Sequence, residues 1–466
     1  MITMDTKKLR QKILDLAISG KLVPQDPNDE PASVLLERIR AEKERLIAEG
    51  KIKRPKKSKS SSAESHYQNF EPPFPIPNSW EWVRLEELCC RFSTGPFGSA
   101  LHKHDYCTEG TPLINPTNIK EGRISISAIK RVCPDKVSEL FRYILNENDI
   151  ILARRGDLSK CAVISEEQAG WICGTGSFYL HLISISPRFF QIVYSSNYCQ
   201  DYLKSESIGG TMDNLNQSLL SEFLIPIPPL SEQLRICCQV DDINCHIEDI
   251  EYSGFICMKT IESVKSHILD LAMQGKLVPQ DPADEPAADM LRRVNPKAKI
   301  ITDNPHYPQL PDNWVLVPLE DITEYEQPQP YIVQDTSYSD RYTIPVLTAG
   351  KSFILGYTNE DFGVYENVPA IIFDDFTTDS RLVNFPFKVK SSAMKIIQVK
   401  HGLNIEYIAL FMSITRLMGE THKRYWISEY SKILIPIPPL KEQDRIVERV
   451  NVLYHELYKI ISVLSA

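Results

Sequence analysis

Apolar residues recur at alternating steps of three and four along three stretches of the chain. This is the heptad spacing of a coiled coil. In residues 232–273 the apolar stripe is Ile236, Val240, Ile243, Ile247, Ile250, Ile261, Val264, Ile268 and Leu271. It predicts one long helix of roughly 60 Å at ~1.5 Å per residue, weakened at Gly254. The C-terminal stretch carries Ile446, Val450, Leu453, Leu457 and Ile460, and the N-terminal stretch carries Leu9, Ile13 and Leu16.

Three segments of the sequence occur twice. The pairs are 13–32 with 268–287, 76–88 with 310–322, and 225–236 with 435–446. The last pair, IPIPPLSEQLRI and IPIPPLKEQDRI, combines prolines that forbid a helix with an acidic residue suited to a first helical turn. The segments between the repeats differ in length and content. We therefore expect a duplicated helical frame that carries two unlike domains.

The stripe of the C-terminal helix lacks the continuation that the central helix has, and the N-terminal stretch supplies it. We expect the N- and C-terminal helices to complete a copy of the central one, antiparallel to it and related by an approximate twofold axis. The alternative is a set of ordinary amphipathic helices, each lying on its own domain. Gly20 and Gly275 fit the residue after a helix C-terminus. A helix at about 32–49 then precedes a basic, serine-rich linker.

The segments between the repeats are long enough for a domain each. β-like runs (123–129, 149–155, 179–186, 370–376 and 394–400) alternate with helical stretches at 187–206 and 401–415. We expect a mixed α/β fold with a twisted or barrel-like sheet. The predicted organisation is a helical frame (1–50), a basic linker (51–74), a first variable domain (75–230), a central coiled-coil helix with its connector (231–290), a second linker (291–309), a second variable domain (310–440) and a C-terminal coiled-coil helix (441–466).

The composition excludes some kinds of surface and some kinds of site. A net charge of −9 excludes a uniformly basic surface, so any phosphate binding must be local or assisted by a partner. The eleven cysteines form no CxxC pair, which favours reduced thiols and no metal site. Without a signal-peptide core or a membrane-length apolar run, we expect a cytoplasmic protein.

Motifs for catalysis are missing from the sequence. It has no P-loop, and Asn115-Pro116-Thr117 lacks the second proline and the aromatic residue of amino-methyltransferase motifs. Asp374 and Asp375 form an acidic pair, which we interpret as loop-facing carboxylates that avoid phosphate. We expect no catalytic residues and no metal ligands on this chain.

The duplicated ILDLA, GKLVPQD and DEPA segments, the tryptophan-led variable domain and IPIPPLxEQxRI closely resemble the specificity subunit of type I restriction–modification systems, over essentially the whole chain. The resemblance implies two target-recognition domains, each recognising one half of a split, asymmetric DNA site, and a frame that fixes the distance between the halves. It also implies two methyltransferase subunits docked on the frame, joined by motor–nuclease restriction subunits. S-adenosylmethionine, ATP and Mg²⁺ would be bound by those partners and not by this chain. The linker at 50–70 is longer and more basic than its counterpart near 290–309, which leaves its role open.

Glycine-rich and polar segments of the variable domains supply candidate DNA contacts, because glycines allow close approach and these side chains bind phosphates and base edges. In the first variable domain they are Gly95, Phe97, Gly98, Ser99, Lys103, Asn118, Arg154, Arg155, Thr211, Asn214 and Asn216. In the second they are Lys351, Tyr357, Thr358, Thr377, Arg381, Lys423 and Arg424. Two other hypotheses stay open, a cryptic nuclease or methyltransferase and a coiled-coil scaffold that binds only proteins.

Overall fold

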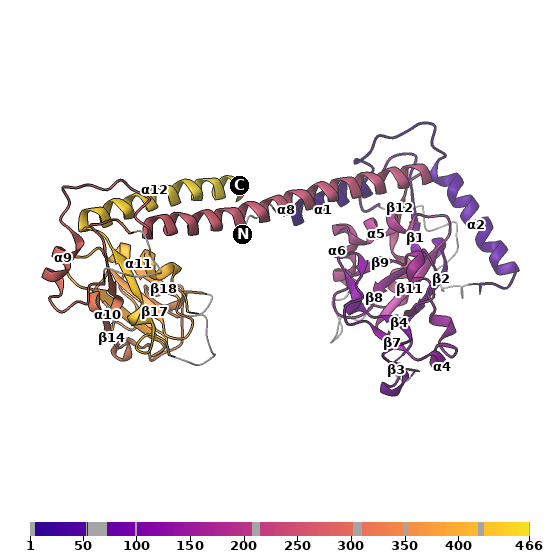
Figure 1. The fold of residues 1–466 in the computed structure, drawn as a ribbon. Helices are drawn as coiled ribbons and strands as arrows, with labels where there is room; N and C mark the ends of the chain where they lie inside the picture. Colours follow the sequence, from indigo (N-terminus) through magenta and orange to yellow (C-terminus); the bar gives the residue numbers. More distant parts are fainter. Residues whose placement is uncertain are drawn as a thin grey trace. The chain divides into compact units, whose positions relative to one another are not determined.

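The computed structural model describes residues 5–52, 54, 72–97, 100–206, 215–301, 310–348, 352–417 and 424–465. The chain forms two compact units, Asp5–Tyr252 and Ser253–Ala466. The boundary between them lies within the long helix α8 (Figure 1). We call them the N-terminal unit and the C-terminal unit. Helix α8 spans Leu230–Met273, so the predicted central helix is confirmed, and Gly254 lies inside it.

The N-terminal unit contains the first variable domain. Its helices are α1 (Thr6–Ile18), α2 (Ala32–Ala48), α3 (Leu85–Leu88), α4 (Pro134–Val137), α5 (Pro187–Ser195), α6 (Asn197–Glu206), α7 (Gln217–Glu222) and the first part of α8. Its strands are β1 (Glu81–Arg84), β2 (Cys89–Thr94), β3 (Tyr106–Cys107), β4 (Thr111–Ile114), β5 (Ile119–Lys120), β6 (Arg123–Ile124), β7 (Lys130–Val132), β8 (Ile150–Ala153), β9 (Cys161–Val163), β10 (Ile172–Cys173), β11 (Ser177–Leu182) and β12 (Leu224–Ile227). Short 3₁₀ turns include η2 (Lys103–Asp105) and η3 (Pro116–Asn118).

The C-terminal unit contains the second variable domain. Its helices are the second part of α8, α9 (Ala287–Val294), α10 (Leu319–Ile322), α11 (Ile405–Ile414) and α12 (Leu440–Ser465). Its strands are β13 (Val315–Pro318), β14 (Thr323–Glu326), β15 (Ile344–Leu347), β16 (Ile354–Thr358), β17 (Ala370–Asp374), β18 (Ser380–Val383), β19 (Lys388–Val389), β20 (Met394–Val399) and β21 (Leu434–Ile437).

The two variable domains share one topology. The main sheet has the order β2-β11-β8-β9 in the first domain and β14-β20-β17-β18 in the second, antiparallel throughout. A second sheet contains one parallel pair, β4 with β10 or β15 with β19. A short ribbon, β1 with β12 or β13 with β21, pairs the tryptophan-led entry of each domain with its IPIP exit. The predicted α/β class is therefore confirmed, and the duplication extends to the variable segments.

Each unit also repeats an antiparallel pair of frame helices. In the N-terminal unit, Arg10 of α1 donates to Asn244 of α8 at 2.8 Å, while Gln25, beyond the end of α1, contacts Glu232 near the start of α8. In the C-terminal unit, the Tyr454 hydroxyl of α12 donates to the Lys265 carbonyl of α8 at 3.4 Å. The predicted antiparallel packing is confirmed within each unit. That α12 and α1 together complete a copy of α8 stays a prediction.

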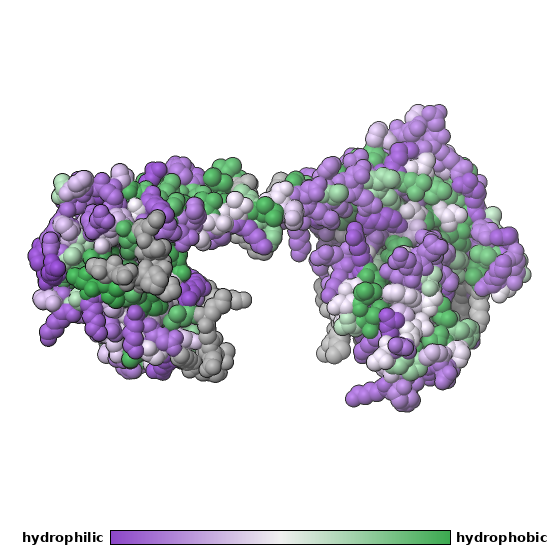
Figure 2. Space-filling model, in the orientation of Figure 1, coloured by the Kyte–Doolittle hydropathy of each residue, from purple (hydrophilic) through white to green (hydrophobic). Residues whose placement is uncertain are grey.

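The predicted apolar stripe is buried over only part of its length. Ile236, Val240, Ile247, Ile261, Ile268, Ile446 and Val450 are buried, but Leu9, Ile250, Val264 and Ile460 are between 38% and 48% exposed. Helix α1 has 13 residues, too few to cover the stripe on the first part of α8. Figure 2 shows apolar surface along the helix pair of the C-terminal unit. In the described part of this chain the heptad stripe is therefore only partly covered.

Local strand predictions succeed where the run is buried. Strands β8, β17 and β20 lie in the predicted runs, β11 overlaps its run at 179–182, and α5, α6 and α11 lie in the predicted helical stretches. The run at 123–129 is wrong, because only Arg123–Ile124 forms a strand. Ala128 adopts a positive φ of 55°, which ends the extended backbone. In the described part of the chain, no helix has the length and apolar character needed to cross a membrane.

Candidate nucleic-acid interface

In the first variable domain, loops that follow several strands meet at one end of the sheets. The Gly95 N–H, after β2, donates to the Ser177 carbonyl at 2.9 Å, and the Gly174 N–H donates to the Ile114 carbonyl at 2.8 Å. The Arg154 N–H donates to the Gly176 carbonyl at 2.8 Å. Strand pairing therefore brings segments far apart in the sequence into one loop cluster.

Two glycines make this close packing possible. A Cβ on Gly95 would lie 2.0 Å from the Gly174 carbonyl oxygen, and one on Gly174 would lie 2.5 Å from the Ile114 carbonyl oxygen. Gly95 is buried, so the expectation that it lets a ligand approach the backbone is wrong. Its missing side chain serves the packing of one loop on another.

Arg154 lies at the centre of the loop cluster. Its guanidinium carbon is 5.6 Å from the ring centroid of Phe97 and 5.8 Å from that of Phe178. Its Nε has no hydrogen-bond partner among the described atoms. Phe97 is 59% exposed, and Arg155, the next residue in the sequence after Arg154, is exposed as well. Aromatic contacts on a guanidinium limit its rotamers and leave its terminal nitrogens free to donate. The arrangement suits a fixed cationic donor at an exposed edge.

Other predicted contacts of the first domain divide into three groups. Lys103 is exposed on η2, which leads into β3 of the second sheet, and Asn216 is exposed and caps α7. Asn118 is buried, where its Oδ1 accepts from the Asn115 N–H at 3.0 Å, so its assignment as a DNA contact is wrong. Gly98, Ser99, Thr211 and Asn214 lie outside the described residues.

The residue that follows β17 in the second domain makes the same backbone hydrogen bonds as the residue that follows β8 in the first, but its side chain differs. We call this position the junction. The Asp375 N–H donates to the Ala393 carbonyl at 3.0 Å, matching the bond from Arg154 to Gly176. The Tyr425 N–H donates to the Asp375 carbonyl at 3.0 Å, matching the bond from Leu215 to Arg154, also at 3.0 Å. Asp375 therefore occupies the position of Arg154.

The carboxylates at this junction are structural. Asp375 accepts from the Trp426 N–H at 2.8 Å and pairs with Lys395 at 3.6 Å. Asp374 accepts from the Phe376 N–H at 2.8 Å. Both aspartates are at most 4% exposed. The interpretation of this pair as loop-facing carboxylates is wrong, because both turn inward to satisfy backbone donors.

Positive charge at this end of the second domain comes from arginines that contact phenylalanines. Arg381 lies over the ring of Phe353 at 4.7 Å and Arg424 over that of Phe376 at 5.9 Å. Both arginines are exposed. Sequence reasoning missed Phe353 and Phe376. Both phenylalanines lie close in the sequence to predicted contacts, Phe353 near Lys351 and Phe376 beside Thr377, and this is the signal that could have found them.

Three further predicted residues of the second domain are described. Thr377 is exposed in the turn between β17 and β18, and Tyr357 is half-buried on β16. Thr358 is buried and its hydroxyl accepts from the Glu360 N–H at 3.3 Å, so its assignment as a DNA contact is wrong. Lys351 and Lys423 lie outside the described residues.

A buried carboxylate joins each variable domain to the frame. Glu232, in the first turn of α8, accepts from the Trp80 Nε1 at 3.0 Å and from the Gln25 amide at 2.5 Å. Glu442, in the first turn of α12, accepts from the Trp314 Nε1 at 3.1 Å and from the Gln280 amide at 2.5 Å. We call these two clusters the latches. Sequence reasoning found the repeated Glu-Gln pair but not its partners, which lie up to 207 positions away.

Neighbouring side chains complete each latch. The Gln233 Oε1 accepts from the Ser186 N–H, and the Gln443 Oε1 accepts from the Asn404 N–H, both at 2.9 Å. Burial raises the pKa of the Glu232 and Glu442 carboxyls above the ordinary value, while the bonds from tryptophan and glutamine oppose the rise. Each latch therefore holds the frame, the entry strand and a late helix of the variable domain together.

The described residues include no group of three or more His, Cys, Asp or Glu side chains arranged to hold a metal ion. The loop clusters offer guanidinium groups, aromatic rings and backbone amides. Such groups bind phosphates, base edges and base faces. The chemistry that they support best is binding of a nucleic acid.

The duplicated topology defines a class of two-domain α/β proteins on a helical frame, and known proteins share it. The family model described as "Type I restriction modification DNA specificity domain" matches residues 77–248 and again 311–462. The chain therefore belongs to the type I restriction modification DNA specificity family.

Curated relatives agree with this membership, and a solved structure has the same fold. The specificity subunit of the type I restriction enzyme EcoR124I/EcoR124II of Escherichia coli is 52% identical over 128 residues, 26% of this chain and 32% of that protein. The EcoAI specificity subunit of Escherichia coli is 30% identical over 380 residues, 69% of this chain and 59% of that protein. The matches thus span about a third and three fifths of these relatives' own lengths. A chain solved in work on complex assembly and conformational transition of the type I R-M system has the same fold, with a TM-score of 0.55 at 18% identity over 84% of this chain and 94% of that one.

Proposed function

We propose that this chain is the DNA sequence-specificity subunit of a type I restriction–modification complex, in which each variable domain recognises one half of a bipartite target. The observation that carries the proposal is the pair Arg154 and Asp375. One topology places them at the same backbone junction, and their side chains have opposite charge. Because Asp375 turns inward, the first domain offers Arg154 at this edge and the second offers Arg381 and Arg424, so the two copies are suited to two different base sequences.

The frame supports the second part of the proposal, a fixed spacing between the halves of the target. Helix α8 has 44 residues, which corresponds to ~66 Å of helix at ~1.5 Å per residue. A latch fixes each variable domain to the frame helices of its own unit. Because α8 connects the two variable domains and has a set length, it fixes the number of base pairs in the spacer between the two half-sites.

Partner subunits supply additional positive charge and the catalytic groups of the complex. With a net charge of −9, the chain binds the duplex strongly only when partner subunits help to neutralise phosphates. We propose that two methyltransferase subunits dock on the frame, and that motor–nuclease restriction subunits join them in the cytoplasm. S-adenosylmethionine, ATP and Mg²⁺ then belong to those partners, and catalysis does as well.

Sequence selection tests the proposal. The intact complex, purified through a tag on this chain, is mixed with a random duplex library, and the retained DNA is sequenced. We expect two specified blocks separated by an unspecified spacer of fixed length. Retained DNA without a motif would overturn the proposal. In parallel, the chain alone is incubated with DNA, Mg²⁺ and labelled S-adenosylmethionine, where methyl transfer or cleavage would contradict a non-catalytic role.

A further inference from the structure

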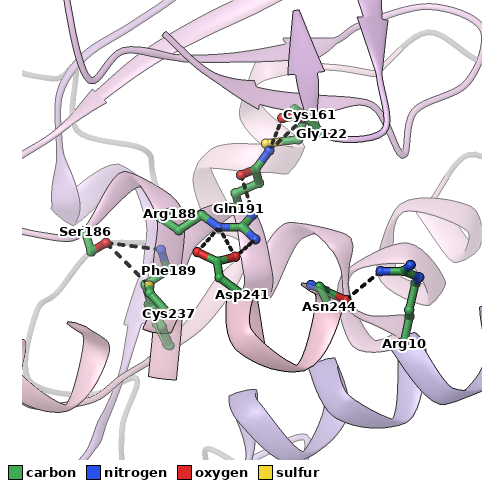
Figure 3. Close-up of polar contacts among 10 residues, drawn as sticks. All are labelled: Arg10, Gly122, Cys161, Ser186, Arg188, Phe189, Gln191, Cys237, Asp241 and Asn244. Atoms are coloured by element: carbon green, nitrogen blue, oxygen red, sulfur yellow. Dashed lines mark hydrogen bonds and ion pairs between the residues drawn. The ribbon is translucent and has the colours of Figure 1, made fainter. Parts of the chain in front are cut away.

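Helix α5 lies between the frame helix α8 and the sheets of the first variable domain, and it carries a line of polar contacts (Figure 3). The Arg188 guanidinium, at the start of α5, donates to both carboxylate oxygens of Asp241 on α8, at 3.2 Å from Nε to Oδ1. Its Nη1 also donates to the Gln191 Oε1 at 2.7 Å. One guanidinium thus bridges the frame and a side chain that points into the domain.

Gln191 continues the line into the domain interior. It is 4% exposed, and its Nε2 donates to the Gly122 carbonyl at 2.6 Å and to the Cys161 carbonyl at 3.1 Å (Figure 3). Its oxygen accepts one bond and its amide nitrogen donates two, so the buried amide is satisfied only while all three partners stay in place. We call Asp241, Arg188 and Gln191 the relay.

Both carbonyls at the inner end of the relay belong to segments that lead into the loop cluster. Cys161 begins β9, directly after the loop 154–160 that starts at Arg154. Gly122 is in the turn between β5 and β6, just after η3. The Lys160 Nζ donates to the Pro116 carbonyl at 3.3 Å and ties these two segments together. Named contacts therefore connect α8 to the loop that carries Arg154.

The second variable domain has the same backbone without the relay. Ser186 and Asn404 are equivalent, because each caps its helix and donates its N–H to the glutamine of its latch. Counted from these caps, Glu406 replaces Arg188 and Ala409 replaces Gln191. Counted from the IPIPPL segments, Asn451 replaces Asp241. The latches are duplicated, whereas the relay is particular to the first domain.

We propose that Arg188 and Gln191 are positioning residues for DNA recognition by the first variable domain, and that they hold the 154–160 loop in register with α8 through Asp241. The inference rests on the proposed function. It follows that a change at the frame end of the relay alters base preference in one half-site only. The second domain, without a relay, keeps its base preference when its equivalent positions change.

Asp241→Asn is the sharpest test, since the side chain of Asp241 is 53% exposed and exposed ion pairs add little to stability. The intact complex with D241N, R188A or Q191A is titrated with duplexes that carry single-base changes in either half-site. Melting of each complex is followed in parallel. We expect discrimination at the first half-site to fall by roughly 5–150-fold, the range of energetic couplings between sites, with the second half-site and the melting temperature of D241N unchanged.

Matched variants complete the experiment. N451A and E406A, at the equivalent positions of the second domain, are expected to change neither half-site. R188K keeps a cation that can donate to both Asp241 and Gln191, and it is expected to retain discrimination in the first half-site better than R188A. Unchanged discrimination in D241N and R188A would overturn the relay, and so would an equal loss at both half-sites. If the wild-type complex itself shows no sequence preference, the proposed function has failed, a result distinct from failure of the relay.

Discussion

Arg154 and Asp375 occupy the same position in two copies of one fold, with a cation in the first variable domain and a buried carboxylate in the second. Each residue contacts the equivalent residue of the neighbouring strand. In the first domain that neighbour is Phe178, and in the second it is Lys395, which pairs with Asp375 at 3.6 Å. The shared fold thus accepts either a cation or a carboxylate at this position of the candidate interface. The second domain obtains its positive charge from Arg381 and Arg424.

The first prediction concerns Arg154. Because its guanidinium is fixed between Phe97 and Phe178, we expect R154A to relax base preference at one position of one half-site by ~1–3 kcal/mol. R154K keeps the charge but loses the planar fork, so it should keep affinity and lose preference. Binding of the complex to duplexes with every base at each position measures both effects. A uniform loss across all sequences, with a salt slope lower by about one, would instead assign Arg154 to a phosphate.

The second prediction concerns the pH dependence of the latches. Burial raises the pKa of Glu232 and Glu442 in the folded protein. Because the folded state holds the proton more tightly, each of these carboxyl groups stabilises the fold while it is protonated. This contribution to stability is fully present below the unfolded-state pKa of ~4.3 and is lost as pH rises through the folded-state pKa.

We therefore expect the melting temperature of the wild type, relative to E232Q or E442Q, to fall between pH 4.5 and pH 7.5. E248Q, at an exposed position on α8, is the control and should show no such trend. A relative melting temperature that rises with pH would show that the hydrogen bonds to the ionised carboxylate outweigh its burial.

The third prediction tests the glycine contacts of the loop cluster. A Cβ on Gly95 would lie 2.0 Å from the Gly174 carbonyl oxygen, so G95A must push two loops apart. We expect a loss of ~1–3 kcal/mol in the free energy of unfolding, typical of overpacking, and impaired recognition of one half-site. T94A, which removes atoms at the adjacent half-buried residue, is the control. Normal recognition by G95A would show that the loop cluster is not the interface.

The fourth prediction concerns the length of α8. Deleting seven residues from its centre shortens it by ~10 Å and nearly preserves the facing of its two ends. We expect the preferred spacer to shorten by about three base pairs at ~3.4 Å each, with both half-site sequences unchanged. Deleting five residues rotates one end by roughly 140° and should abolish specific binding. An unchanged spacer after the heptad deletion would exclude α8 as the element that sets the distance.

Much of the frame could be predicted from the sequence because its signals are local. The three- and four-residue spacing predicted α8, and the repeated Gly20 and Gly275 both follow helix ends with positive φ. Partial burial of the stripe was not predictable, since it depends on how many residues of α1 lie against α8.

The interface was less predictable because long-range strand pairing builds it. Asn118 and Thr358 have the chemistry of base contacts, yet each satisfies a backbone donor in a buried turn. The relay joins Asp241 to Gly122 through α5, a connection that no local pattern contains.

The central claim is that two domains recognise two separate half-sites. Mapping methylated bases in the genome of cells that express this chain with its methyltransferase partner tests it most directly. We predict one bipartite motif with two specified blocks and a spacer of constant length. An exchange of residues 90–220 for those of another family member should change one block only. A single uninterrupted motif, or a change in both blocks after the exchange, would contradict the account.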